Sequence, residues 1–296
     1  MKDQIKNLRW TILISILIAS CSGDNSQYVQ RAVRLMDKQG LFAEGPEWEA
    51  AKAAALSAQP TSLEEERAVV ESALKVAGGK HSGIKYADAV KEDAISEWPA
   101  PSVTTEDDGI PVIALPPFSG NHDEGFKYAN TVLDAIPDNI PGVVIDLRGN
   151  LGGNMYPMIS AVHRFLPGDN EMLRFRSRKH TQWITLDFVL QGTGIKKQSR
   201  IECPVAILTN DRTASSGEAT LICFRGLDYV RVFGSSTAGY ASANQPFLLP
   251  GGDELVLTTG CDVARTGEVF CDDPIEPDVL TGTPLEDALE WLRSNN

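Results

Sequence analysis

The chain has 296 residues and a formal charge of −13 at neutral pH, from 40 acidic and 27 basic side chains. So acidic a chain argues against nucleic acid as a partner. Its length suffices for one large domain, or for one domain with a small companion.

The first twenty residues are typical of an export signal. A basic start precedes the apolar segment 10–19, which is too short to span a bilayer. The sequence IASC at 18–21 resembles a bacterial lipoprotein signal that is cut before Cys21, which then carries the lipid. An ordinary secretory signal followed by a chance cysteine is the alternative. On the first interpretation, 21–27 is a polar tether and the protein is lipid-anchored in the cell envelope, at the periplasmic face of the outer membrane.

Four cysteines follow Cys21, and an even number permits disulfides after export. We expect Cys261 and Cys271 to pair, because a bond between them could close a hairpin. Whether Cys203 pairs with Cys223 stays open. The sequence has no CxxC, no HExxH and no other His/Cys cluster of the metal-binding kind, so no metal or cofactor is expected.

Residues 28–86 are expected to form a small helical subdomain. Apolar residues recur at helical spacing in the first helix, the second is rich in alanine, and Ser62 with Glu65 forms a capping-box pattern before the third. The expected helices are 28–39, 48–57 and 62–77, followed by a polar turn at 80–83. The acidic, proline-containing segment 87–109 is predicted to be a linker loop.

Residues 110–296 alternate between apolar runs and amphipathic segments, which indicates an α/β core. The run 142–147 is continuously apolar, as expected for a strand that is buried on both faces. The expected strands are 110–115, 142–147, 204–208 and 230–233, with a hairpin of 247–249 and 254–258; the expected helices are 123–136, 156–165, 215–224 and one that starts near 284.

The segment 168–200 differs from the rest because it is basic. It carries seven Lys or Arg residues with aromatic residues between them. A flap that faces the substrate and a solvated strand pair on the surface are both compatible with this pattern. Arg174, Arg176 and Arg178 are the basic residues that would test the first alternative.

Two turns that each lead from a strand into a helix stand out as candidate site elements. One contains Gly152-Gly153 and the other contains Ser215. A helix N-terminus favours negative charge, which suits an acyl-transfer nucleophile. If the two strands are adjacent and parallel, both turns lie at one sheet edge. The backbone N–H of Gly152 or Gly153 could then form an oxyanion hole with that of Ser216, whereas the lysine and spacing of a phosphate-binding P-loop are absent.

These motifs resemble the C-terminal-processing (tail-specific) peptidase family. The matching stretches are VIDLRGNLGG at 144–153, TASSGE at 213–218, Gly234-x-x-Thr-Ala-Gly and IEPD at 275–278, in that order. The resemblance covers roughly 110–280 and implies a ClpP/crotonase-like core and serine-dependent hydrolysis of peptides or proteins. It implies Ser215 as the nucleophile, with Ser216 as the rival.

The resemblance leaves two choices for the catalytic base. One branch of the family uses a lysine directly after the Thr-x-Gly motif, where this chain has Tyr240. The tricorn-like branch uses a histidine from the N-terminal region, in a Gly-x-His-Ser context that His81 matches, and imidazole titrates near neutrality. The weaker candidates are His122, His163 and His180.

A third group should orient the imidazole. The tricorn-like branch uses a glutamate near the end of the core, which corresponds best to Glu276, with Asp273 and Asp272 as competitors. Many relatives carry a PDZ domain before the core, and the segment between Tyr86 and Ile110 is too short for one.

The sequence therefore predicts a serine peptidase of the tricorn-like branch. A catalytically silent ligand- or peptide-binding protein on the same core is the alternative from another class, and another acyl hydrolase is a third. Oligomeric state and substrate preference do not follow from the sequence.

Overall fold

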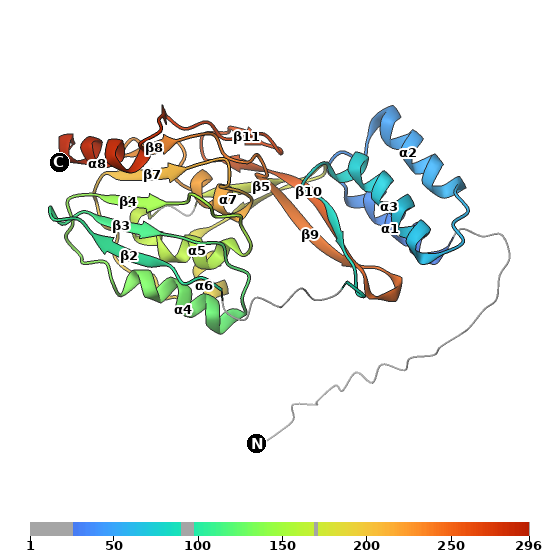
Figure 1. The fold of residues 1–296 in the computed structure, drawn as a ribbon, viewed down its shortest axis with the longest axis horizontal. Coiled ribbons are helices and arrows are strands. Elements are labelled where there is room, and N and C mark those ends of the chain that lie inside the picture. Colours follow the sequence, from blue (N-terminus) through green and yellow to red (C-terminus); the bar gives the residue numbers. More distant parts are fainter. Residues whose placement is uncertain (1–25, 90–97, 169–170, 296) are drawn as a thin grey trace, which may run out of the picture.

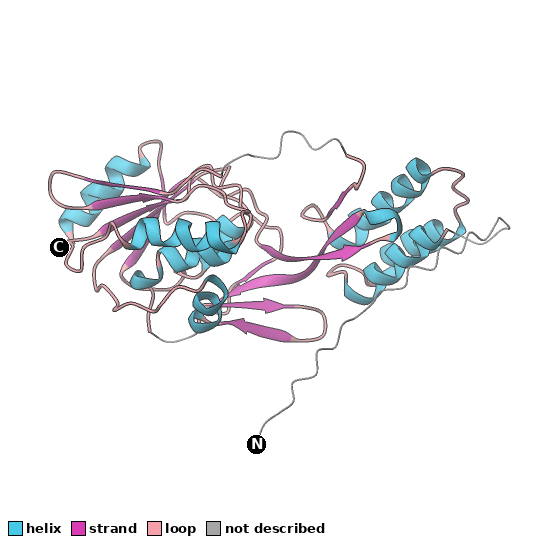
Figure 2. Cartoon of the chain, turned by 90° about the horizontal axis from the view of Figure 1, so that it is seen from below, coloured by secondary structure: helices cyan, strands magenta, loops and turns pink. Residues whose placement is uncertain are grey.

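The computed structural model describes residues 26–89, 98–168 and 171–295, which form two lobes (Figure 1). A helical lobe lies at one end and an α/β lobe at the other, with the strands β9 (Ser242–Leu248) and β10 (Glu254–Ala264) between them (Figure 2). The expected signal peptide and Cys21 lie outside the described residues. None of the helices within those ranges is long and apolar enough to cross a membrane.

The N-terminal lobe confirms the three predicted helices, which are α1 (Gln27–Gln39), α2 (Gly45–Ser57) and α3 (Leu63–Gly78). The Ser62 hydroxyl accepts a hydrogen bond from the Glu65 N–H (3.2 Å), as the capping pattern predicts, whereas the Glu65 carboxylate accepts from the Thr61 N–H instead (2.6 Å). Gly79 ends α3 with a φ of 66°. That conformation favours glycine and turns the chain out of the helix toward His81.

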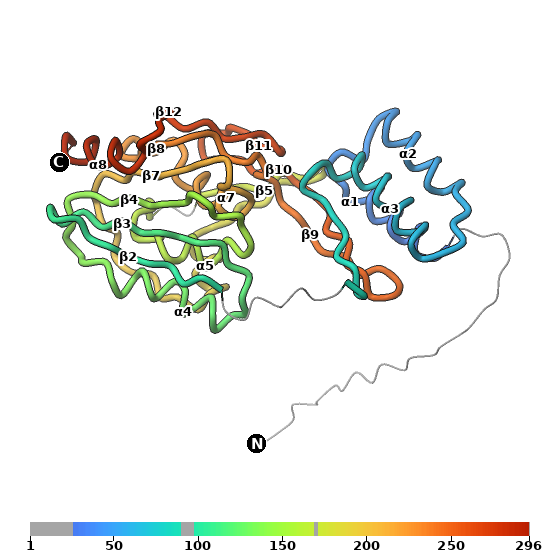
Figure 3. The backbone as a smooth tube through the Cα atoms, in the orientation of Figure 1, coloured from blue at the N-terminus to red at the C-terminus, as the bar shows by residue number. Residues whose placement is uncertain are grey.

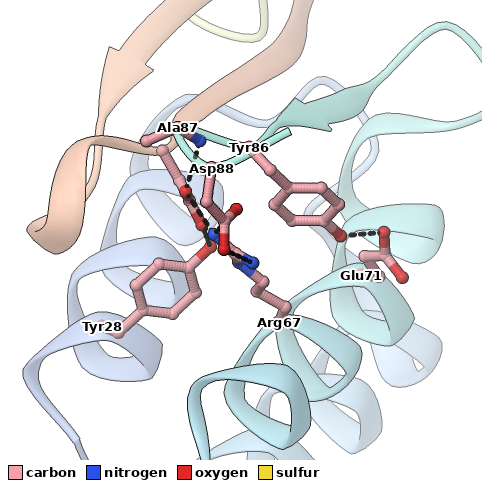
Figure 4. A network of polar contacts seen from close by, with 7 residues as sticks. Tyr28, Arg67, Glu71, Tyr86, Ala87 and Asp88 are labelled. Carbon is pink, nitrogen blue, oxygen red and sulfur yellow. Dashed lines mark hydrogen bonds and ion pairs between the residues drawn. The ribbon is translucent and has the colours of Figure 1, made fainter. Parts of the chain in front are cut away.

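A polar network fastens this lobe to the tip of the β9–β10 hairpin (Figure 4). The Arg67 guanidinium donates to both oxygens of Asp253 (2.8 Å each) and to Asp88 (2.6 and 3.0 Å). The Tyr28 hydroxyl also donates to Asp253 (2.8 Å). The hydrogen bonds from Arg67 lower the pKa of Asp253 most, and together these contacts lower it to about 2. The buried carboxylate is thus paired from two helices, which fixes the hairpin relative to the lobe.

The α/β lobe is built on a sheet whose strand order is β12-β8-β7-β4-β3-β2 in the described chain. All neighbours are parallel except β2 and β3, which are antiparallel. Strand β2 lies in the segment predicted to be a loop, so that prediction is wrong there. Its residues are mostly polar because it is an edge strand that is largely exposed to solvent. The bounds are β2 (Ser102–Thr105), β3 (Pro111–Ala114), β4 (Val143–Asp146), β7 (Val205–Thr209), β8 (Val230–Gly234) and β12 (Val279–Leu280).

Helices cover both faces of this sheet. Val143 and Ile145 of β4 belong to the larger core, under the central helices, while Val144 between them packs with α8 on the other face. This confirms that 142–147 is a strand buried on both faces. The helices are α4 (His122–Leu133), α5 (Met155–Ala161), the short η1 (His163–Phe165), α6 (Leu186–Thr193), α7 (Ser216–Ile222) and α8 (Pro284–Ser294).

Strand β10 is the link between the lobes (Figure 3). Its first half pairs with β1 (Gly83–Lys85), which leads out of α3, and its second half pairs with β5 (Leu173–Arg176) beside the core. Strands β9 and β11 (Val269–Phe270) also pair with β10, and β6 (Thr181–Ile184) pairs with β5. The short helix η2 (Pro250–Gly252) lies at the hairpin tip. The predicted Cys261–Cys271 disulfide is present, and Cys203 and Cys223 are free and buried.

The basic segment forms the β5–β6 hairpin and α6. Arg178 donates to the carbonyl oxygens of Ala43 (2.8 Å) and Asp37 (2.7 Å) in the helical lobe. Arg174 lies over the Trp183 ring, 4.6 Å from its centre. Arg178 therefore joins the hairpin to the helical lobe, whereas Arg174 packs within the hairpin, so charge reversal at either would disturb structural contacts.

Candidate active site

Ser215 lies at the turn between β7 and α7, in a strained backbone conformation. Its φ is 51° and its ψ is −115°, a region that residues with a side chain rarely adopt. Strands β4 and β7 are adjacent and parallel, so the Gly152-Gly153 turn and the Ser215 turn do meet at one sheet edge. A Cβ on Gly152 would lie 2.7 Å from the Ser215 Cβ, so only glycine permits this approach.

Glu218 holds the serine turn in place. Its carboxylate accepts hydrogen bonds from the backbone N–H groups of Ser215, Gly239 and Tyr240 (2.8 Å each) and from the Thr237 hydroxyl. Burial raises the pKa of this carboxyl, and the four hydrogen bonds oppose the rise. Glu218 therefore connects the Ser215 turn to the segment that follows β8.

Of the two glycines predicted to contribute to an oxyanion hole, only Gly153 is suitably placed. The Gly152 N–H already donates to the Asn150 Oδ1 (2.9 Å), and Gly152 does not line the pocket. Gly153 and Ser216 do line it, and within the described residues neither N–H has a hydrogen-bond partner. The Ser216 hydroxyl, the rival nucleophile, donates to the Gly153 carbonyl oxygen (2.7 Å). Its proton is therefore already engaged in a hydrogen bond. The Gly153 and Ser216 N–H groups thus remain as candidate oxyanion donors.

His81 enters the same pocket as Ser215. It lies in the turn between α3 and β1, and the Asn244 amide on β9 donates to its carbonyl oxygen (3.0 Å). The helices α1 to α3 lie away from α7 (Figure 1). His81 nevertheless lies near the core, because the strand that follows it, β1, pairs with β10. No hydrogen bond joins His81 to Ser215 in the described chain.

A serine and an aspartate orient the imidazole. The Ser242 hydroxyl donates to the Asp272 Oδ1 (2.6 Å) and lies 2.9 Å from the His81 Nδ1. Because the Asp272 carboxylate only accepts, the single Ser242 proton points toward it. The His81 Nδ1 must then be the donor to Ser242, so the Nε2 is unprotonated, as a general base requires.

The surroundings also favour the neutral form of His81. Burial lowers the pKa of the imidazole, and the positive charge of Lys80 adds to this, while the negative charge of Asp272 acts in the opposite direction. The Tyr240 ring packs edge-on against the imidazole, with 5.3 Å between ring centres. The Lys80 ammonium is exposed, lies 4.8 Å from the centre of the Tyr240 ring and is not among the pocket residues, so it does not replace the missing lysine base.

The pocket has a volume of about 580 Å³ and is lined by residues from several elements. The other three histidines do not line it. His163 is buried and uses both ring nitrogens in hydrogen bonds, and His122 and His180 are exposed. In the parts of the chain that the structure describes, no group of His, Cys, Asp or Glu could hold a metal ion.

Glu276 does not line the pocket. It is exposed, and its carboxylate accepts a hydrogen bond from Ser236 (2.7 Å). The 275–278 motif, to which Glu276 belongs, instead ties the chain to β8 and the segment after it. The backbone of Ile275 bonds to Thr237, and the Asp278 carboxylate accepts from the Val232 N–H (2.8 Å). Of the three predicted acids, Asp272 is therefore the one that contacts Ser242 beside His81, and its neighbour Asp273 is exposed.

Sequence reasoning missed Ser242 and treated Asp272 only as a competitor. Ser242 faces Cys261 across the β9–β10 pair, and Cys261 is bonded to Cys271, directly before Asp272. The disulfide thus brings the aspartate to the serine. The predicted disulfide could have pointed to Asp272, because Asp272 directly follows Cys271 and the disulfide holds that cysteine beside β10.

Replacing Asp272 by asparagine should lower kcat about tenfold, since the imidazole loses its orientation. The negative charge of Asp272 raises the pKa of His81, so its removal lowers that pKa further. A general base must be unprotonated, so the rate of a reaction in which His81 takes a proton falls as pH drops through its pKa. We therefore expect the acid limb of the kcat/KM profile to move to lower pH. The exposed Asp273→Asn is the control and should leave the profile unchanged; a limb that moves to higher pH in Asp272→Asn would contradict the assignment.

Comparison with known proteins shows what the chain as a whole is similar to. The sequence profile of peptidase family S41 matches residues 109–281. A nisin-resistance protein from Lactococcus lactis subsp. lactis is 31% identical over 277 residues, which are 90% of this chain and 87% of that protein. The structure of a lipoprotein from Streptococcus agalactiae superposes with a TM-score of 0.82 at 29% identity, covering 95% of this chain and 100% of that one.

A more distant relative matches part of the chain. The protein named Probable CtpA-like serine protease from Staphylococcus aureus (strain N315) is 23% identical over 171 residues, which are 58% of this chain and 33% of that protein. The matched segment therefore corresponds to only a third of that relative.

Proposed function

Because this chain belongs to peptidase family S41, we propose that it is a serine peptidase that cleaves peptide bonds through an acyl-enzyme on Ser215. One observation carries the proposal: Ser215 and His81, far apart in the sequence, line one pocket, and Ser242 leaves the His81 Nε2 free to take a proton. We further assign the chain to the tricorn-like branch, in which a histidine replaces the lysine base, and the segment between Tyr86 and Ile110 is too short for a PDZ domain.

The reaction follows from these positions. The His81 Nε2 takes the Ser215 proton as the serine Oγ attacks the scissile carbonyl carbon. The N–H groups of Gly153 and Ser216 donate to the oxygen that becomes negative. The His81 imidazolium then gives its proton to the leaving amine, and the C–N bond breaks. Water, deprotonated by His81, hydrolyses the ester and restores Ser215.

The missing His81–Ser215 hydrogen bond is compatible with this mechanism. Catalytic hydrogen bonds are often long before substrate binds and tighten in the complex. His81 and Ser215 both line the same pocket. A bound peptide would fill it and bring its scissile carbonyl against both groups.

The relatives suggest where the peptidase works and on what. A nisin-resistance protein resembles this chain over most of its length, so peptides of the nisin kind are the proposed substrates. The lipoprotein-like signal at 18–21 suggests that the enzyme works in the cell envelope. A lipid on Cys21, with 21–27 as the tether, would hold it in the envelope, as in the lipoprotein of similar structure.

A binding protein without catalysis is the second candidate, and the absence of a direct His81–Ser215 hydrogen bond in the described residues is the observation that favours it. Such a protein would sequester the peptide in the pocket instead of cleaving it. The two candidates differ in the reactivity of Ser215.

Labelling with a fluorophosphonate, which reacts with activated serines, separates the candidates. We expect the wild type to be labelled, Ser215→Ala to be unlabelled and Ser216→Ala to remain labelled, because only the hydroxyl of Ser216 is lost. Incubation with nisin, followed by mass spectrometry, should show fragments with the wild type and with Ser216→Ala, and none with Ser215→Ala. Labelling that survives Ser215→Ala would reject this nucleophile, and an unlabelled wild type would favour the binding protein.

A further inference from the structure

Asp262 is a buried carboxyl group in the wall of the pocket that contains Ser215. It lies on β10, where it pairs with Phe175 of β5 and Phe270 of β11, and only 2% of the residue is exposed. Its Oδ1 has no hydrogen-bond partner among the described residues. An unpaired buried polar atom costs free energy, so a group of this kind calls for a partner that the chain itself does not supply.

The neighbours of Asp262 do not provide that partner. None of the described residues that line the pocket is a lysine or an arginine. Burial, together with the negative charges of Glu218 and Asp272, raises the pKa of the Asp262 carboxyl well above its ordinary value. The side chain faces a concentration of negative charge, and a cation in the pocket would relieve it.

The rest of the pocket wall suits a long side chain with a charged end. Phe175, Ala219, Pro246 and Met155 contribute apolar surface beside Ser215. Lysine and arginine have apolar stems that pack on such surface while the charged group reaches a polar partner. A purely apolar substrate side chain would leave the Asp262 oxygen without a partner.

We propose that Asp262 selects peptides that place a lysine or arginine side chain in the pocket, next to the bond attacked by Ser215. The stem lies against Phe175, Ala219 and Pro246, and the buried Asp262 carboxylate turns toward the pocket to accept from the ammonium or guanidinium group. This assignment rests on the proposed peptidase function and names the class of substrate for the same pocket. A charge-assisted hydrogen bond in a site shielded from water is a strong source of discrimination.

The test measures binding and does not depend on turnover. The Ser215→Ala variant is titrated with peptides in which lysine or the uncharged, nearly isosteric norleucine is placed at each of the four positions around the scissile bond. At one position we expect lysine to bind at least about tenfold more tightly than norleucine. Adding Asp262→Asn should reduce this ratio to about one, and adding the exposed Asp273→Asn should leave it unchanged.

Equal affinity for lysine and norleucine at all four positions, or a lysine preference that persists in Asp262→Asn, would overturn the proposal and make Asp262 a buried structural group. Thermal melting checks that Asp262→Asn is folded; since the carboxyl group lacks a partner in the chain, we expect no loss of melting temperature. A variant that loses its fold would contradict the proposal, because it would show that the chain itself depends on the carboxylate.

Fluorophosphonate labelling in the same preparations separates this proposal from the proposed function. Labelled Ser215 without lysine preference overturns the role of Asp262 alone. An unlabelled wild type whose Ser215→Ala variant still prefers lysine overturns catalysis and retains Asp262 as a binding determinant.

Discussion

Replacing His81 by alanine is expected to lower kcat/KM about a thousandfold, with little change in stability. The serine hydroxyl is a weak nucleophile, and His81 is the histidine that lines the Ser215 pocket in the described chain. The oxyanion donors and the binding pocket remain, so a residual rate above that of uncatalysed hydrolysis should persist. Hydrolysis of a quenched fluorescent peptide measures the effect.

The wild-type pH profile provides a second check on this residue. Burial lowers the pKa of His81 below the ordinary value of 6.5. We therefore expect kcat/KM to remain high at neutral pH and to decline only as pH falls through this lowered pKa. His122→Ala, an exposed histidine outside the pocket, is the matched control and should retain full activity. A His81→Ala enzyme with wild-type turnover would exclude this base.

Replacing Glu218 by alanine is expected to lower the free energy of unfolding by about 3–5 kcal/mol and to abolish activity. The change leaves the N–H groups of Ser215, Gly239 and Tyr240 without their acceptor in a buried region. It also releases Ser215 from its strained conformation, so the hydroxyl is no longer aimed into the pocket. Urea unfolding followed by circular dichroism measures the loss.

Glu276→Ala is the matched control for Glu218. Glu276 belongs to another motif of the family pattern, but it is exposed and has a single contact with Ser236. We expect a change in unfolding free energy within about 0.5 kcal/mol, and normal turnover. If Glu276→Ala removed activity while Asp272→Asn retained it, the assignment of the orienting acid would return to Glu276.

The local patterns of the sequence predicted most of the elements. The continuous apolar run before Gly152 and the strand before Ser215 are confirmed as neighbouring parallel strands, because burial on both faces leaves a clear record in the sequence. The prediction for 87–109 is wrong at β2, since a polar edge strand and a loop have the same composition. The predicted hairpin was right in kind but short, because β9 and β10 extend further than their apolar stretches.

The family pattern, the candidate nucleophile Ser215 and the candidate base His81 could all be found in the sequence, since they depend on residue types within short motifs. The acid that faces the base could be found only in the folded chain. Asp272 reaches His81 through Ser242 because β9 and β10 pair in one register and a disulfide brings the next loop to them. Asp262 is likewise buried because β10 pairs there with both β5 and β11. Such contacts join residues far apart in the chain, and local composition does not record the strand register that creates them.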